Sequence, residues 1–335
     1  MSFQDGDGRD IRASCIAAAI LALILAFVIV ARIEAAKRKE EPTGDLTGRF
    51  EEQRTITYNG KEYRMRNKLT SVLMMGIDTW SDRPMMNSGF RSGGQSDFLL
   101  LMVIDHDRKT VTPIQIDRDT MTEITVLGVL GNVAGTRTAQ ICLSHGFGNG
   151  GEQSALFTVD AVAKLLLGVP VDFYVAMQLD GIATLNDALG GVTVTLDDDF
   201  TALDPAMTKG STLALRGKQA EYYTRHRMSI GVGTNASRMV RQRQYIQKVS
   251  EIFDAKIHEN ANYVGTLFDV LQPFMESSMR RGRMINEAAN TSDYQRLPTV
   301  QLQGEHVTGK NGFVEFHADA DALMQMVLNI YYQSV

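Results

Sequence analysis

A continuous apolar run near the amino terminus places the firmest constraint on how this chain can fold. Residues 13–31 carry no charge, and Ser14 is their only polar member. A helix of 19 residues is just long enough to cross the roughly 30 Å hydrocarbon core of a bilayer. A cleaved signal peptide is the alternative, but it would have a shorter apolar core and a small-residue cleavage site. We therefore expect an uncleaved transmembrane signal anchor.

The charges around this run leave its orientation open. More positive charges follow it than precede it, which would keep the large domain inside the cell. Long domains can nevertheless cross a membrane regardless of flanking charge. Residues 32–53 are rich in charge and contain Pro42 and Gly44, so they are expected to form a stalk.

Composition narrows the class of the remaining chain. The formal net charge is −5 and the pI is near 5.7, which argues against a general nucleic-acid surface. Only two cysteines are present, Cys15 and Cys142, so no disulfide framework and no CxxC motif exists. Cys142 precedes His145 by three residues, which could suggest a nucleophile pair, but a structural thiol is the commoner case.

Periodicity predicts an α/β domain over residues 54–335. Asn59-Gly60 between two alternating segments is a strong β-hairpin signal. Strands are then expected at residues 70–77, 98–104, 110–116, 171–179, 192–196 and 299–302. Helices are expected at residues 154–167, 180–189, 263–277 and 319–332, and from residue 238 onward. Alternation of this kind predicts a layered α-β-α domain with a central mixed sheet.

An arginine-rich stretch between residues 209 and 247 is unusual in an acidic chain. If Arg225 and Arg227 lie on a strand, both side chains project from one face. If the chain is helical from Arg238, then Arg238, Arg241, Gln242 and Tyr245 fall on one stripe. For Arg241 and Arg243 the alternative is a solvated position beside the site. Arginine forks bind phosphate in a bidentate manner, so these side chains predict a polyanion site. The alternative is a solvated basic helix face.

Other charged residues are expected where predicted strands begin or end. Asp78 closes one strand, Asp97 precedes the next, and Arg118 follows the third. Ligands in open α/β sheets gather near strand ends, so these three residues are candidates for one site.

These segments, taken in order, resemble the LytR-CpsA-Psr family of cell-wall glycopolymer ligases. The resemblance covers about residues 55 to 250. It is carried by Asn59-Gly60-Lys61, Met75-Gly76-Ile77-Asp78, Gly94-Gln95-Ser96-Asp97, Asp117-Arg118-Asp119-Thr120, Leu185 to Val192, Leu215 to Ala220 with Arg225-His226-Arg227, and Arg238 to Gln242.

The resemblance implies a cytoplasmic tail at residues 1–12, a single membrane span at 13–31 and an extracellular catalytic domain. It also implies transfer of a phosphoglycan, such as a teichoic acid or capsule polymer, from an undecaprenyl-diphosphate carrier to peptidoglycan. The acceptor would be N-acetylmuramic acid, the product a phosphodiester, and the metal Mg²⁺. The implied partners are the lipid-linked glycan, peptidoglycan and the cytoplasmic membrane, with no nucleic acid.

The resemblance also implies roles for individual residues. Asp78 and Asp97 would hold the magnesium or position the acceptor hydroxyl. Diphosphate would be bound by Arg118, Arg225, Arg227, Arg238 and Gln242. Two departures from the family pattern are present: Gln95 stands where many members carry arginine, and Gln115-Ile116-Asp117 stands where many carry Ser-Ile-Pro. Gln95 removes a possible phosphate contact, and Asp117 adds negative charge near the implied site.

Two other functions stay open at this stage. One is a pyrophosphatase that hydrolyses the carrier with the same side chains. The other is a non-catalytic polyprenyl-phosphate sensor or envelope regulator. A lipid pocket is also expected, with candidate lining residues Met74, Leu99, Leu101, Val103, Ile114, Phe173 and Val175.

Overall fold

The computed structural model describes residues 55–79, 93–128, 131–227, 230–260 and 262–335. The chain forms two compact units. In the described residues, the sheet unit comprises 55–177, 276–279 and 293–335, and the helical unit comprises 178–275 and 280–292. The predicted membrane anchor lies outside the described residues. No helix within the described ranges is long and apolar enough to span a bilayer.

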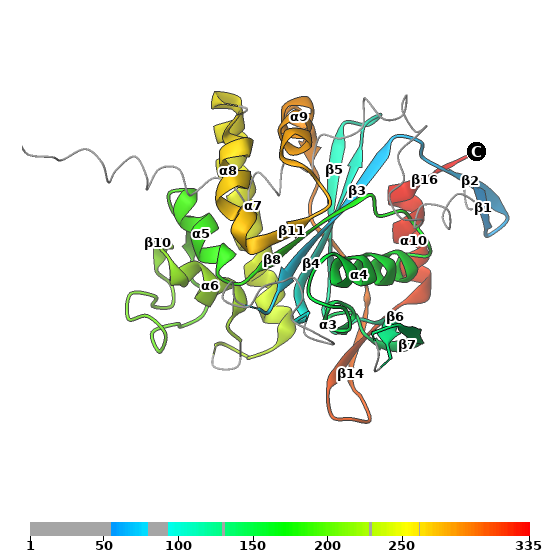
Figure 1. Cartoon of the computed structure of the whole chain (residues 1–335), viewed down its shortest axis with the longest axis horizontal. Helices are drawn as coiled ribbons and strands as arrows, with labels where there is room; N and C mark the ends of the chain where they lie inside the picture. Colours follow the sequence, from blue (N-terminus) through cyan, green and yellow to red (C-terminus); the bar gives the residue numbers. More distant parts are fainter. Residues whose placement is uncertain (1–54, 80–92, 129–130, 228–229, 261) are drawn as a thin grey trace, which may run out of the picture. The chain divides into compact units, whose positions relative to one another are not determined.

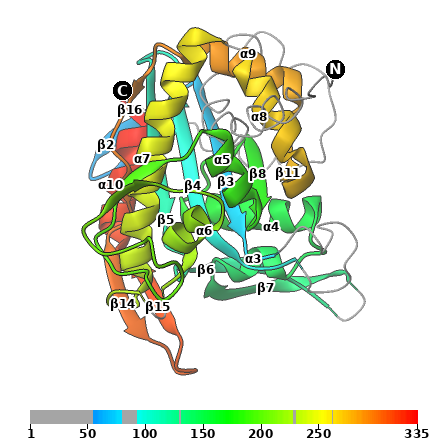
Figure 2. The ribbon, with the colours of Figure 1, turned by 90° about the vertical axis from the view of Figure 1, so that its left-hand side faces the viewer.

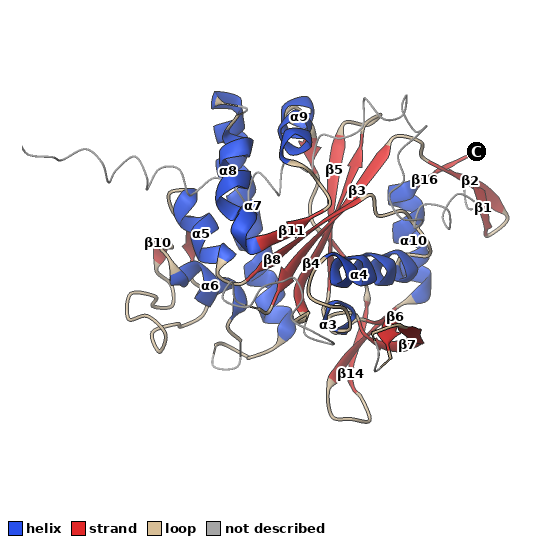
Figure 3. Cartoon of the chain, in the orientation of Figure 1, coloured by secondary structure: helices blue, strands red, loops and turns tan. Residues whose placement is uncertain are grey.

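A mixed seven-stranded sheet forms the centre of the sheet unit (Figure 3). Strand β4 pairs antiparallel with both β3 and β5, while β12 and β13 run parallel to β5. The predicted mixed sheet is thus confirmed; the three-layer arrangement stays a prediction. The strands are β3 (Leu69–Ile77), β4 (Ser96–Asp105), β5 (Thr110–Ile116), β8 (Phe173–Gln178), β11 (Met275–Ser277), β12 (Gln295–Arg296) and β13 (Val300–Gln301).

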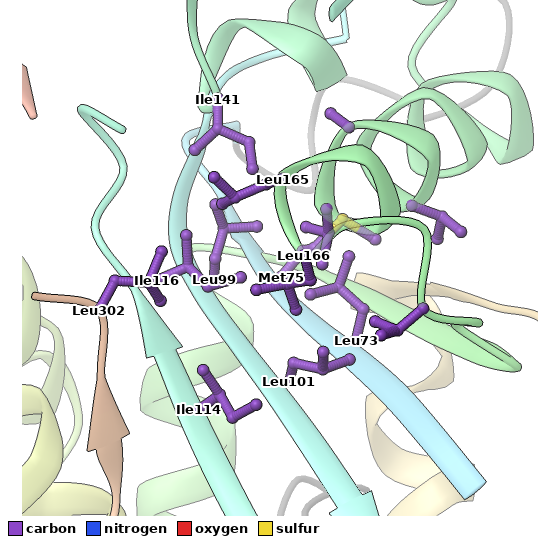
Figure 4. Close-up of a cluster of buried hydrophobic side chains, with 14 of the residues drawn as sticks. Leu73, Met75, Leu99, Leu101, Ile114, Ile116, Ile141, Leu165, Leu166 and Leu302 are labelled. Atoms are coloured by element: carbon purple, nitrogen blue, oxygen red, sulfur yellow. The ribbon is translucent and has the colours of Figure 1, made fainter. Parts of the chain in front are cut away.

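Alternate residues of the central strands build one hydrophobic core (Figure 4). Leu73, Leu101 and Ile114 lie on one face in register, and they cluster with side chains of α4 (Glu152–Leu165) and α10 (Ala320–Tyr331). The intervening residues, such as Val72 and Met102, are buried as well. Burial on both faces explains why these strands read as continuous apolar runs.

This packing corrects the expected lipid pocket. Leu99, Leu101, Val103 and Ile114 belong to the core cluster. Met74 and Val175 alternate with core residues along β3 and β8, so they lie on the other face of the sheet. The seven side chains therefore do not share one face of the sheet, because strand alternation separates them.

Smaller elements complete the sheet unit. In β1 (Thr55–Tyr58) and β2 (Lys61–Met65) the predicted hairpin is confirmed, with positive φ at Asn59 and Gly60. The carboxyl-terminal strand β16 (Tyr332–Ser334) pairs with β2. Elements that the sequence did not predict are β6 (Met121–Leu127), β7 (Val133–Gln140), α3 (Leu143–Gly146), β14 (Gly304–Thr308) and β15 (Val314–Ala318).

The helical unit is built around α7 (Asn235–Glu259), with α6 (Lys218–Arg225) packed against it (Figures 1 and 2). Thr234 caps α7, since its hydroxyl accepts a hydrogen bond from Ser237 N at 3.2 Å. The remaining elements are α5 (Gly181–Ala188), β9 (Thr193–Thr195), β10 (Thr212–Ala214), α8 (Tyr263–Leu271), the 3-10 turn η2 (Gln272–Phe274) and α9 (Arg281–Thr291). The helix predicted over 263–277 ends earlier, at Leu271, because Pro273 lacks an N–H to continue it.

Candidate functional site

Three neighbouring strands bring the charged residues of the sheet unit to one edge. Because β4 is antiparallel to β3 and β5, its start lies beside the ends of both, with Ile77 opposite Ser96 and Leu99 opposite Ile116. Asp78 follows β3, Arg118 follows β5, and Asp97 lies inside β4 rather than before it. The predicted trio is therefore brought together at a single edge.

Arg118 is the centre of this cluster, and its guanidinium contacts residues from three segments. Nη1 donates to Asp97 Oδ1, and Nη2 donates to Gln95 Oε1 at 2.5 Å. Nη2 also lies 3.3 Å from Cys142 Sγ, and Nε lies 3.4 Å from Asp119 Oδ1. Burial lowers the pKa of Arg118, but Cys142, Asp97 and Asp119 outweigh it, so the pKa is raised and the side chain stays charged.

Gln95 links this cluster to Asp78 through its backbone. Gln95 N donates to Asp78 Oδ1 at 2.5 Å, and Asp78 N donates to Gln95 O at 3.0 Å. The preceding residue must be glycine, because Gly94 has φ +70° and a Cβ there would lie 2.5 Å from Thr79 Cγ2. The Gly94-Gln95 turn thus fixes the Asp78 carboxylate against β4.

Cys142 and His145 lie in the same region but form no nucleophile pair. Burial raises the pKa of Cys142 to about 12, although Arg118 opposes that shift, so the thiol is protonated at neutral pH. Burial also lowers the pKa of His145 to about 4. The neutral imidazole donates Nδ1–H to Gly93 O at 2.6 Å. Cys142 is a buried structural thiol, and His145 Nδ1 bonds to the backbone just before Gln95, while its buried Nε2 has no hydrogen-bond partner among the described residues.

Arg225 and Arg227 belong to the helical unit, and here the expected strand is wrong. Residues 218–225 form helix α6, which starts after Gly217 at positive φ. Lys218-Gln219-Ala220-Glu221 are good helix formers, and they outweigh the β-branched and aromatic residues that follow. Arg225 therefore lies in the last helical turn, with Nη1 3.4 Å from Glu221 Oε1, and Arg227 follows the helix.

Helix α7 carries the predicted stripe. Arg238, Arg241, Gln242 and Tyr245 are all buried on one face of α7. Arg238 Nη2 donates to Asn235 Oδ1 at 2.5 Å. Gln242 Nε2 donates to Thr224 O at 3.2 Å, which joins α7 to the end of α6. The helical spacing of these polar residues is thus confirmed.

Arg241 is the residue that sequence reasoning misread as a possible solvated neighbour. It is 2% exposed, and its Nη1 and Nη2 donate to the carbonyls of Tyr223 and His226, the second at 2.6 Å. The guanidinium carbon lies 5.2 Å from the centre of the Phe200 ring. Arg241 therefore holds the backbone between Arg225 and Arg227, and its place on the Arg238 stripe was the available signal.

The seven predicted site residues divide between the two units. Asp78, Asp97 and Arg118 belong to the sheet unit, and Arg225, Arg227, Arg238 and Gln242 belong to the helical unit. As for a metal, no group of three or more histidine, cysteine, aspartate or glutamate side chains able to hold one exists in the described ranges. Asp78 and Asp97 still fit Mg²⁺, which proteins commonly hold with one or two carboxylates plus substrate phosphate and water.

Comparison with known proteins shows which family this chain belongs to. The model of the LytR_cpsA_psr family matches residues 31–330, most of the chain. The protein belongs to the LytR_cpsA_psr family. Among curated relatives, the polyisoprenyl-teichoic acid–peptidoglycan teichoic acid transferase TagU of Bacillus subtilis is 30% identical over 264 residues, 76% of this chain and 74% of its own. The TagU of Bacillus mycoides is 25% identical over 265 residues, 79% and 78% of the two chains.

Solved structures of similar proteins share the fold. A Streptococcus agalactiae protein aligns with a TM-score of 0.65 at 24% identity, over 78% of this chain and 86% of its own. TagV of Bacillus subtilis aligns with a TM-score of 0.61 at 23% identity, over 79% of this chain and 97% of its own. The fold of the described residues is thus that of the LytR_cpsA_psr family.

Proposed function

We propose that this protein transfers a phosphoglycan from a polyprenyl-diphosphate carrier to peptidoglycan. The observation that carries the proposal is the match over three quarters of the chain to transferases of polyisoprenyl-linked teichoic acid. A muramic acid hydroxyl attacks the phosphorus that bears the glycan, and a phosphodiester forms. The bond from that phosphorus to the bridging oxygen breaks, and polyprenyl phosphate leaves with the electron pair.

The charged side chains supply what this chemistry needs. Phosphoryl transfer depends on positioning and on neutralising the phosphate oxygens. We assign diphosphate binding to Arg118, Arg225, Arg227, Arg238 and Gln242. Asp78 and Asp97 are assigned to the acceptor side, where a carboxylate orients the attacking hydroxyl and takes its proton.

Magnesium is proposed at the same two carboxylates. When bound, Mg²⁺ would neutralise charge on the phosphate oxygens. Asp97 Oδ1 already accepts a hydrogen bond from Arg118, so the guanidinium and a cation compete for this carboxylate. The Asp78 carboxylate, whose Oδ1 accepts from the neutral backbone N–H of Gln95, is the other candidate ligand.

The proposal includes the arrangement of the chain at the membrane. Residues 1–12 form a cytoplasmic tail, residues 13–31 the anchor, residues 32–53 the stalk and residues 54–335 the extracellular catalytic domain. An anchored domain is suited to a carrier whose polyprenyl chain lies in the bilayer.

A reconstituted reaction tests the function. The full-length protein in detergent is mixed with a polyprenyl-diphosphate-linked teichoic acid precursor, with and without peptidoglycan. We expect polyprenyl phosphate release that depends on peptidoglycan, together with glycan bound covalently to the wall. Release of the same size without peptidoglycan identifies a hydrolase instead. Bound lipid with no release in either case identifies a sensor.

A further inference from the structure

Gln95 contacts both Arg118 and Asp78. Its side-chain Oε1 accepts from Arg118 Nη2 at 2.5 Å, and it lies 3.8 Å from Cys142 Sγ. Its backbone bonds to Asp78 in both directions. One residue, immediately before β4, therefore connects the end of β3 to the arginine that follows β5.

Cys142 closes this arrangement from the other side. Its N donates to Arg118 O at 3.1 Å, and its carbonyl accepts from Ser96 N at 3.1 Å. Its protonated thiol can donate to Gln95 Oε1, while its sulfur faces Arg118 Nη2. We call Gln95 and Cys142 together the Arg118 clasp. The clasp contacts Nη2 of Arg118. Asp97 accepts from Nη1, so contacts on both terminal nitrogens fix the plane of the guanidinium.

The chemistry of an amide suits this role. A primary amide oxygen accepts from the guanidinium without carrying a charge, so it adds no further negative charge beside Arg118, which already pairs with Asp97 and Asp119. A carboxylate at the same place would neutralise the charge, and an apolar side chain would leave buried N–H groups unpaired. An arginine side chain that is only 14% exposed and held in one plane loses little rotamer freedom when an anion binds.

We propose that Gln95 is a positioning residue, which orients Arg118 for the diphosphate and does not itself contact the substrate. The inference rests on the proposed function. A positioning role differs from a packing role in one measurable respect. If Gln95 only positions Arg118, substituting Gln95 should affect activity only when Arg118 is present.

A double-mutant cycle tests this dependence in the full-length protein. Gln95→Met is nearly isosteric but offers no oxygen acceptor. Two quantities are measured: kcat/KM for transfer, and the Kd of inorganic pyrophosphate by calorimetry. Outer-shell partners that orient metal ligands typically contribute about 10- to 100-fold to affinity or activity. By analogy, we expect Gln95→Met to lower kcat/KM by about tenfold or more and to raise the Kd several-fold. In an Arg118→Ala background, the same change should alter either quantity by less than about twofold.

Controls separate the possible outcomes. Gln333→Met changes an exposed glutamine on β16 and should match the wild type. If Arg118→Ala folds poorly, Arg118→Lys replaces it, since lysine cannot form the same fork. Wild-type values for Gln95→Met, or equal losses in both backgrounds, overturn the positioning role. If the wild type transfers no glycan, the proposed function fails, and the pyrophosphate cycle still decides the role of Gln95.

Discussion

Replacing Arg241 by methionine should destabilise the helical unit far more than any exposed arginine would. The substitution keeps an unbranched apolar stem but removes two hydrogen bonds, from Nη1 to Tyr223 O and from Nη2 to His226 O. It also removes the ion pair of Nε with Asp198 Oδ2 at 3.8 Å and the stacking on Phe200.

The magnitude follows from these contacts. Each hydrogen bond from a charged donor contributes about 1.5–3 kcal/mol. Two carbonyls also lose their partner, while burial of the methionine stem offsets part of the cost. We expect the free energy of unfolding to fall by about 3–5 kcal/mol, the range seen when a buried ionic contact is broken.

Urea unfolding followed by circular dichroism measures this loss. Lys248→Met is the matched control on the same helix, because Lys248 is exposed and its pair with Glu251 lies at the surface, where such pairs contribute at most about 1 kcal/mol. A loss below about 1 kcal/mol for Arg241→Met would refute the anchoring role. In that case, the hydrogen bonds of Arg241 would not explain how the backbone at Arg225 and Arg227 is held.

Three further predictions concern activity and pH. Arg227→Ala should abolish glycan transfer while the melting temperature stays within about 2 °C of the wild type, since exposed or half-buried charges away from the core contribute little stability; retained turnover would remove Arg227 from the diphosphate site. Asp97→Asn should shift the magnesium titration of transfer to higher concentration, and an unchanged titration counts against a metal role. His145 has a pKa lowered to about 4 in the folded protein, so the unfolded chain takes up its proton first as the pH falls below about 6.5. Stability should drop by up to about 1.4 kcal/mol per pH unit between pH 6.5 and 4, and His145→Asn should flatten that slope; equal slopes in urea unfolding would contradict the assignment.

Local signals in the sequence were enough to predict the sheet unit's centre. The apolar runs of β3, β4 and β5 are long and end at charged residues, so their strand assignment and the meeting of Asp78, Asp97 and Arg118 follow from alternation and antiparallel pairing. The Asn59-Gly60 turn was equally clear because its positive φ values demand those residue types. Strand β7 gave no such signal, since six of its eight residues are exposed and its hydrophobic pattern is absent.

Side-chain partners were harder to predict than elements. A strand was considered for Arg225 and Arg227 because alternation would place both side chains on one face. The helix-forming residues Lys218 to Glu221 and the packing of α6 against α5 and α7 favour the helix instead. Arg241 looked solvated because its partners are backbone carbonyls, which carry no sequence signature. No periodicity distinguishes an arginine that binds a ligand from one that binds its own chain.

Asp117 shows how a departure from the family pattern can be absorbed locally. Its carboxylate was expected to add negative charge beside Arg118, the arginine proposed to bind phosphate. In the structure it is buried, and Oδ1 accepts from Asp119 N at 2.8 Å while Oδ2 lies 2.9 Å from His306 Nε2 on β14. Strand β15 adds a hydrogen bond from Phe316 N to Asp119 O at 2.8 Å. The carboxylate therefore shapes the loop on both sides of Arg118 and ties that loop to the β14–β15 hairpin, so its charge is engaged by Asp119 N and His306.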